Sequence, residues 1–166
     1  MPNDAVRMNF GLNVLGLFAI VGSGLIAGVF FAFSSFVMKA LRDLPPAAGI
    51  AAMQRINVVV INPIFMTPFL GTVVVCVALT AIAIFRWGQS SPFLLAGSAL
   101  YVVGTFGVTL VFNVPRNNAL ESLRPDSTQA EVPWPRYVTT WTRWNHVRTV
   151  AALSAMIAFS LALQRM

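Results

Sequence analysis

The sequence has 166 residues, of which 57% are hydrophobic and only 10% are charged, so it offers too little polar surface for an ordinary soluble domain. Its formal net charge of +6 comes from lysines and arginines that are dispersed between apolar runs, and this pattern argues against nucleic-acid binding. Cys76 is the single cysteine, which leaves neither a disulfide framework nor a cysteine metal cluster.

Long runs without charge predict membrane-spanning helices. Between Arg7 and Lys39 lie 31 uncharged residues, between Arg55 and Arg86 lie 30, and between Arg86 and Arg116 lie 29. About 20 helical residues cross the roughly 30 Å of hydrocarbon in a bilayer, so each run is long enough to span. The first run follows an arginine as in a signal peptide, but it is far longer than an h-region and has no persuasive cleavage site. We therefore expect it to remain as a membrane helix.

The fourth apolar run is too short to span on its own. Only 16 residues separate Arg148 from Arg165, so a spanning helix must begin earlier and include Trp144, Asn145 and His146. This requirement places the only histidine and an arginine near or inside the membrane boundary. Ionisable groups at that depth are costly in free energy and are functional candidates by default.

Together these runs predict an all-α fold, an integral membrane four-helix bundle built from two helical hairpins, with a single transmembrane domain over 1–166. The expected helices are 10–41, 50–86, 92–113 and 136–164. The polar loop before the last helix is 114–135. Pro45 and Pro46 suit the start of a new helix. Pro63 and Pro68 should kink the second span, and the polar stretch 113–118 should end the third.

The basic residues predict an orientation in the membrane. With four crossings, 3 of the 11 lysines and arginines share the side of both termini and 8 lie on the other side. The positive-inside rule then places the two larger loops in the cytoplasm and both termini outside, in a multi-pass protein of the plasma (inner) membrane. Gly24 and Gly28 lie on a small-residue face that can pack within the bundle or, alternatively, form a homo-oligomer.

Polar and aromatic side chains from three expected helices meet at one membrane face; they are Gln54, Asn57, Asn113, Asn117, Tyr137, Trp141, Trp144, Asn145, His146 and Arg148. Amides, aromatic rings, an imidazole and a guanidinium at one depth predict a pocket for a flat, partly polar ligand. Simpler roles remain open, because tryptophan and tyrosine also anchor helices at bilayer boundaries and asparagines also join helices by hydrogen bonds.

Helical geometry separates these residues on the last helix. At 100° per residue, one stripe that continues into small alanines contains Tyr137, Trp141, Trp144, Asn145 and Arg148. His146 falls on nearly the opposite side, so its catalytic role is less secure than that of Arg148. No acid lies in any span to pair with Arg148, which therefore either snorkels to lipid phosphates or faces an anionic ligand or an enolate.

Metal and haem sites find little support in the sequence. One histidine and one cysteine in different regions form no recognisable metal-ligand set, so we expect no metal. A haem would use His146 as its single axial ligand, and this remains an alternative.

Four motifs follow one another along the chain: GLIAGVFFAFS at 24–34, MQRIN at 53–57 with an Asn-Pro pair at 62–63, NVPRN at 113–117, and WTRWNHVRT at 141–149. Their order resembles the anthrone oxygenase family. The resemblance implies a four-helix integral membrane protein, because this is the architecture of the family. It also implies an activity, since characterised relatives oxidise an anthrone to an anthraquinone with dioxygen, without a metal or organic cofactor.

If the chain shares this activity, its partners are a small lipophilic aromatic substrate, dioxygen and the lipid bilayer. His146 is then the candidate base, Arg148 and Asn145 stabilise the enolate or peroxide, and the other predicted residues contact the substrate: Asn113 and Asn117 as orienting amides, Trp141 and Trp144 as walls, and Tyr137, Asn57 and Gln54. Two other functions remain open. One is a non-catalytic lipophile-binding carrier, and the other is a haem- or quinone-binding redox module.

Overall fold

A computed structural model describes residues 2–125 and 133–166 of the chain, and those residues form helices and short turns without a β-strand. In chain order the segments are α1 (Pro2–Ala32), the π-helix η1 (Phe33–Val37), α2 (Met38–Arg42), α3 (Pro46–Val59), α4 (Pro63–Phe85), α5 (Ser91–Ala99), the π-helices η2 (Leu100–Gly107) and η3 (Thr109–Asn113), α6 (Val114–Glu121) and α7 (Pro133–Leu163).

Consecutive segments join into four long apolar helices. The described residues contain four helices long and apolar enough to cross a membrane: Phe10–Arg42, Pro63–Phe85, Ser91–Glu121 and Pro133–Leu163. This finding confirms the predicted all-α bundle and makes the chain a multi-pass integral membrane protein.

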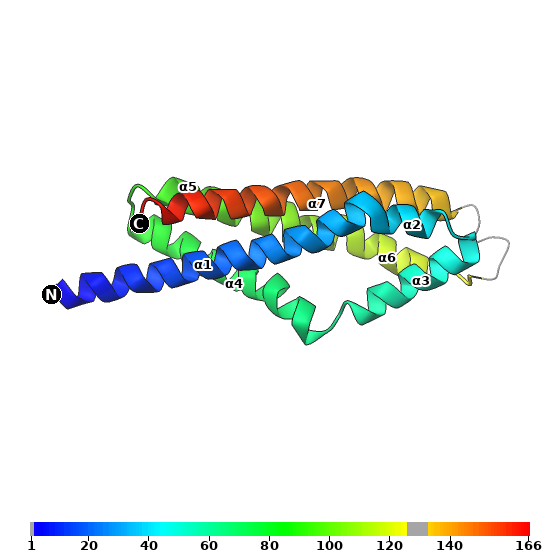
Figure 1. The fold of residues 1–166 in the computed structure, drawn as a ribbon, viewed down its shortest axis with the longest axis horizontal. Helices are drawn as coiled ribbons and strands as arrows, with labels where there is room; N and C mark the ends of the chain where they lie inside the picture. Colours follow the sequence, from blue (N-terminus) through cyan, green and yellow to red (C-terminus); the bar gives the residue numbers. More distant parts are fainter. Residues whose placement is uncertain (1, 126–132) are drawn as a thin grey trace.

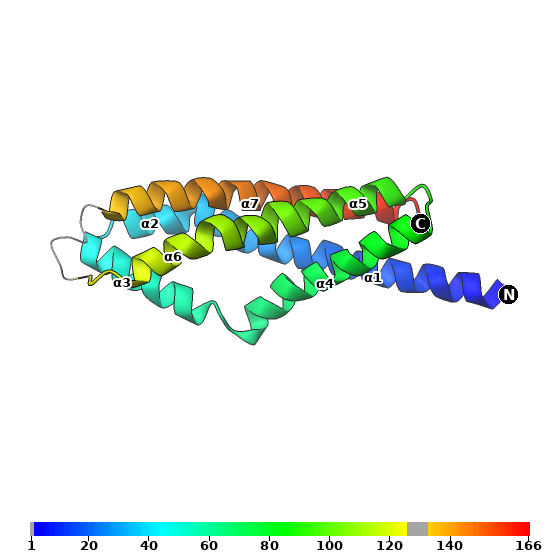
Figure 2. The ribbon, with the colours of Figure 1, turned by 180° about the vertical axis from the view of Figure 1, so that it is seen from behind.

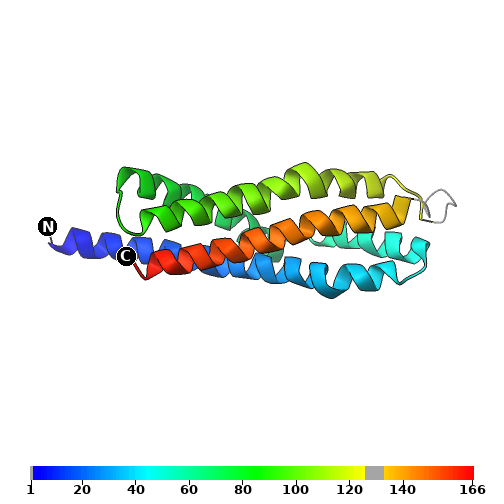
Figure 3. The ribbon, with the colours of Figure 1, turned by 90° about the horizontal axis from the view of Figure 1, so that it is seen from above.

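Helix α7 lies at the centre of the packing. Figure 3 shows it between the α1–α2 rod and the α5–α6 rod, and it contacts both along its length. Helix α4 packs on α1 and α5, whereas α3 packs on α2 and α6. Helices α3 and α4 meet in a V whose corner, which we call the elbow (residues 60–62), projects away from the bundle (Figures 1 and 2). Both termini lie at the same end of the bundle (Figure 1).

The prediction of one continuous second helix over 50–86 is wrong. It is broken at the elbow, and Pro63 opens a new helix rather than kinking an existing one. The Asn62 side chain caps that helix, since its Oδ1 accepts from the backbone N–H groups of Ile64 at 3.0 Å and Phe65 at 3.2 Å. Pro68 does lie inside α4. The paired prolines behave as predicted, because α3 begins at Pro46.

The third predicted helix, 92–113, is too short, and the polar stretch 113–118 does not end it. The helix continues through η3 and α6 to Glu121, and α7 begins at Pro133. Residues 114–121 and 133–135 of the predicted polar loop 114–135 are therefore helical, and 126–132 lies outside the described residues. The polar side chain of Asn113 is buried and finds its partner on α7, so polarity here marks a helix contact rather than a helix end.

Small residues bring α1 close to its neighbours. Ala19, Ser23 and Ala27 are fully buried on its inward face, and a Cβ on Gly22 would overlap the Thr72 hydroxyl of α4. Of the two glycines in the predicted small-residue face, Gly24 lies against the Met156 side chain of α7, whereas Gly28 faces open space. Gly24 thus packs within the bundle, and the homo-oligomer stays a prediction.

Candidate functional site

A cavity of about 380 Å³ lies between α1, the elbow, the η2–α6 rod and α7. Most of its wall is apolar and aromatic, with rings from Phe30, Phe33, Phe65, Phe69, Phe106 and Trp141. Four polar side chains also line it: Asn57, Thr109, Asn117 and Arg148. A largely apolar cavity with a few polar groups on its wall is the usual form of a small-molecule site.

The buried Arg148 is the only charged side chain on this wall. It is 4% exposed, and one terminal nitrogen donates to Thr109 Oγ1 at 3.2 Å while the other donates to Asn145 Oδ1 at 2.6 Å. Its guanidinium carbon lies 4.0 Å from the centre of the Phe30 ring and 5.0 Å from that of Trp141. Arg148 therefore points into the bundle rather than snorkelling to lipid phosphates, held by neutral acceptors and ring faces.

Asn145 fixes this arginine to α1. The Asn145 side chain is fully buried, and its Nδ2 donates to the Phe30 carbonyl at 2.7 Å and to Ser34 Oγ at 2.7 Å. With its amide hydrogens used on Phe30 of α1 and Ser34 of η1, its Oδ1 is turned toward the guanidinium. Ser34 also lies 3.2 Å from Thr149 Oγ1. The network joins α1, α7 and η3 across the cavity and sets the position of the charge.

A second polar group lies toward α6. Asn117 Oδ1 accepts from the Tyr137 hydroxyl at 3.0 Å and from Trp141 Nε1 at 2.8 Å. Asn113 Nδ2 donates to the Trp141 carbonyl at 3.3 Å. These bonds hold the indole of Trp141 as a rigid wall, 5.6 Å from the Phe33 ring centre to centre.

Two buried nitrogen atoms on the cavity wall have no hydrogen-bond partner. They are Nδ2 of Asn57 and Nε of Arg148. Buried donors normally have partners, because leaving one unsatisfied costs about 1–3 kcal/mol. Within the described chain these atoms can be satisfied by a molecule in the cavity, and both would donate to an oxygen of that molecule.

Among the described residues Arg148 forms no salt bridge, and none of the residues that line the cavity is acidic. A buried cation without a protein carboxylate is costly unless hydrogen bonds and a ligand offset its desolvation. The cavity is therefore suited to an oxygen that carries or develops negative charge.

Six predicted residues do not line this cavity. Asn113, Tyr137 and Asn145 bond to residues of its wall, whereas the other three lie elsewhere. His146 is exposed and lines a separate groove on the other side of α7. Trp144 stacks on Phe112, with ring centres 3.5 Å apart and an interplanar angle of 9°. Gln54 Nε2 donates to the carbonyls of Leu120 at 2.9 Å and Leu123 at 3.0 Å, so it ties α3 to the end of α6.

Helix lengths place Arg148 within the membrane. Helix α4 has 23 residues, about 35 Å, and crosses the roughly 30 Å hydrocarbon layer alone. The C-terminal end of α4 lies beside that of α7. There, Arg165 stacks on Phe93 near the start of α5, the helix that follows α4. Measured from Leu163 at 1.5 Å per residue, Arg148 lies about 22 Å along α7 and Trp141 about 33 Å along it, which compares with a hydrocarbon thickness of roughly 30 Å.

Sequence analysis did not single out Thr109 and Phe30, which contact the guanidinium directly. Thr109 had a detectable signal, because Thr105, Thr109 and Asn113 recur every four residues in an otherwise apolar span. Phe30 carried none, since nothing distinguishes it from the neighbouring phenylalanines. Both contacts lie near π-helical turns, at η1 and η3, and such turns are frequent at functional sites.

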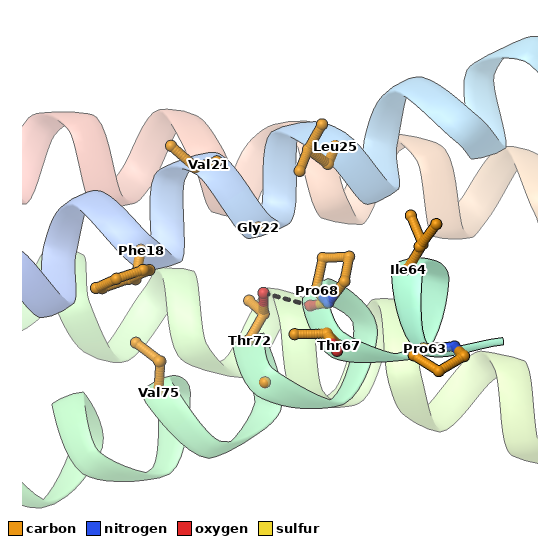
Figure 4. Close-up of a pocket in the computed structure, with 11 residues that line it drawn as sticks. Phe18, Val21, Gly22, Leu25, Pro63, Ile64, Thr67, Pro68, Thr72 and Val75 are labelled. Carbon is orange, nitrogen blue, oxygen red and sulfur yellow. Dashed lines mark hydrogen bonds between the residues drawn. The ribbon is translucent and has the colours of Figure 1, made fainter.

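A larger groove of about 620 Å³ runs between α1 and α4, as Figure 4 shows. Its lining includes Phe18, Leu25 and Ile64 but no charged residue. Of its two hydroxyls, that of Thr72 donates to the Pro68 carbonyl at 2.7 Å (Figure 4). The groove suits contact with lipid better than chemistry.

The part of the chain that the structure describes holds no group of three or more His, Cys, Asp or Glu that could hold a metal ion. The haem alternative depends on His146, which lies outside the cavity. Both the absence of a cofactor and the haem alternative stay predictions.

The sequence model of the anthrone oxygenase family matches residues 63–158. The chain belongs to the anthrone oxygenase family. This match confirms the resemblance drawn from the motifs. It covers α4 to most of α7 and so includes Thr109, Asn117, Trp141, Asn145 and Arg148, whereas the α1 and α3 walls lie outside the matched range. No curated protein and no solved structure matches the chain.

Proposed function

We propose that this member of the anthrone oxygenase family oxidises a lipophilic, anthrone-like or phenolic polyketide with dioxygen to a quinone, in the cavity beside Arg148. The observation that carries the proposal is the buried guanidinium without a carboxylate partner on an aromatic wall. Membership of the family supports an oxygenase-like role.

The ring system of such a substrate would lie among the aromatic walls, with its carbonyl oxygen toward the unpartnered Nε of Arg148. Loss of a proton from the activated methylene gives an enolate whose negative charge rests on that oxygen. A guanidinium in a cavity of low dielectric constant stabilises this charge strongly. Arg148 thereby increases the acidity of the substrate and holds it in place.

The enolate can supply the electrons that dioxygen needs, so the reaction balances without a further reductant. One electron passes to dioxygen, and the two radicals join to form a carbon–oxygen bond and a peroxide. Loss of the second methylene hydrogen as a proton then breaks the oxygen–oxygen bond. The carbon becomes a carbonyl, and the distal oxygen leaves as hydroxide and is protonated to water. One dioxygen is consumed for each quinone formed.

The methylene proton passes to a water molecule in the cavity, which Asn57 and Asn117 help to line. His146 was the base expected from sequence, but its exposed side chain lines a different groove. A substrate acidified by a fixed positive charge needs only a weak base. Arg148 and His146, two neighbours in the last motif, therefore have different roles, since only Arg148 acts on the substrate.

Oxygen uptake by the purified protein tests the proposal. With a panel of anthrones, we expect stoichiometric oxygen consumption and a quinone product identified by absorbance and mass. Binding of anthrones without oxygen uptake would instead support the carrier function. A Soret band in the spectrum of the purified protein would support the haem module.

We further propose the plasma membrane as the location, with both termini on the non-cytoplasmic side. The support is the excess of basic residues at the end of the bundle opposite the termini. A reporter enzyme fused after Met166 that is active only outside the cytoplasm should be active, whereas a cytoplasm-specific reporter should be silent.

A further inference from the structure

A second polar groove, of about 390 Å³, lies between η1–α2 and α7. His146 lies in this groove rather than in the cavity. Basic side chains from both helices line it, namely Lys39, Arg42, Arg143 and His146, together with the hydroxyl-bearing Ser34, Ser35, Thr139 and Thr142. Of its lining, only Ser34 also belongs to the network that holds Arg148, through its bond with Asn145.

The charges in the groove favour an anion. None of the described residues that line it is acidic. Among the described residues, Asp43 pairs with one of its cations, with Oδ1 3.5 Å from Arg42 Nε, and both side chains of that pair are more than half exposed. An exposed pair of this kind is weak, so Lys39 and Arg143 add an uncompensated positive field from two different helices.

One atom of the groove wall lacks a partner. The Oγ1 of Thr142 is buried and makes no hydrogen bond, although most threonine hydroxyls in α7 donate to a carbonyl one turn back, as Thr139 and Thr140 do. A hydroxyl left free beside cations can donate to an anion's oxygen. The groove therefore offers charge and a directed hydrogen bond together.

The depth of the groove indicates which anion reaches it. Measured from Leu163, Arg143 lies about 30 Å along α7, at the far boundary of the hydrocarbon layer. This is the level of lipid phosphate groups, and Met38 and Val138 provide apolar wall beside the cations. A phosphate at this level with an acyl chain below it matches the groove in charge and polarity.

We propose that this groove binds the phosphate group of an anionic phospholipid, held by Lys39, Arg42 and Arg143 and by a hydrogen bond from Thr142. A free phosphate ion shares the recognition chemistry but lacks the acyl chains that the bilayer supplies. The inference is independent of the oxidation, because neither the cavity nor Arg148 takes part in it.

Native mass spectrometry of the intact protein, released from nanodiscs that contain phosphatidylglycerol and phosphatidylcholine, tests the proposal. We expect retained phosphatidylglycerol on the wild type, and about thirtyfold weaker retention on the Lys39→Gln, Arg143→Gln double variant, since each interfacial charge contributes substantially to anionic lipid binding. The matched control is Arg55→Gln, Arg136→Gln, which removes two exposed arginines at the same end of the bundle. It should retain the lipid as the wild type does.

A second pair of variants tests the site without a change of charge. Thr142→Val should weaken phosphatidylglycerol retention about fivefold through loss of one hydrogen bond, whereas Thr140→Val should leave it unchanged. If both double variants lost the same amount of phosphatidylglycerol retention, the effect would come from the net charge of this end of the bundle. That result would overturn the site. Binding of inorganic phosphate in detergent as tight as that of the lipid would also overturn it, because the ion alone would then suffice.

Discussion

Two arginines on α7 lie about 8 Å apart along the helix axis in opposite environments. Arg148 is 4% exposed and holds its neighbours by hydrogen bonds inside the bundle, whereas Arg143 is exposed in a groove at the membrane boundary. The same guanidinium group thus acts on opposite sides of one helix. Depth and hydrogen-bond partners, rather than residue type, therefore separate an arginine suited to chemistry from one suited to lipid contact.

The largest expected effect comes from the buried arginine. Arg148→Ala should lower kcat/KM for an anthrone by at least about 100-fold, as loss of an oxyanion-stabilising donor does. Oxygen uptake and quinone formation measure this loss. The exposed Arg55→Ala on α3 is the control and should retain the wild-type rate. A folded Arg148→Ala protein with full activity would remove the proposed role, and Arg148→Lys keeps the charge in case the alanine variant does not fold.

Steric change where α5 packs against α7 should rank next. A Cβ on Gly97 would lie 2.7 Å from Cε1 of Phe159, whereas a Cβ on Gly28 meets nothing within 4 Å. Gly97→Ala should lower the free energy of unfolding by about 2 kcal/mol through overpacking, and Gly28→Ala should leave it nearly unchanged. Thermal unfolding of the two variants in the same detergent measures the difference. Equal midpoints would mean that the bundle is more plastic than its packing indicates.

The amide that holds the cavity wall gives a smaller effect. Asn117→Leu leaves the Tyr137 hydroxyl and Trp141 Nε1 without their acceptor, which should lower stability by about 1–2 kcal/mol and raise KM for the substrate. Tryptophan fluorescence and substrate titration measure both changes. The exposed neighbour variant Asn118→Leu provides the comparison. An unchanged KM would separate Asn117 from the substrate.

The smallest expected effect is on the other side of the helix. His146→Ala should change the rate of anthrone oxidation by less than about twofold, because its side chain does not reach the cavity. The pH dependence of the rate should likewise keep its wild-type form. A loss comparable to that of Arg148→Ala would restore the histidine as the base and contradict the separation of the two faces.

Much of the fold follows from residue types that the bilayer constrains. Charge-free runs predict the four spans, and the 100° rule predicts the inward face of α7, where Tyr137, Trp141, Asn145 and Arg148 are all buried. The same rule already placed His146 on the opposite side. These predictions succeed because they depend on local periodicity alone.

Contacts between distant segments explain what sequence reasoning missed. Asn113 has the polarity of a helix end, yet its partner is a carbonyl of α7. Gln54 was expected to contact substrate, yet it donates to carbonyls at the end of α6. The chain breaks before Pro63, and the Asn62 side chain caps the new helix that begins there. In each case, the partner that decides the role of a polar side chain becomes known only once the helices are placed together.

The four spans differ in length, and this difference has a mechanical consequence. Helix α4, with 23 residues, is the shortest of the candidate spans, whereas the others have 31 to 33. A thicker bilayer would draw the ends of α4 into hydrocarbon before the longer helices are affected, so hydrophobic mismatch acts first on this helix. Because Phe65 and Phe69 of α4 form part of the cavity wall, lipid chain length becomes a means of adjusting the volume offered to a substrate.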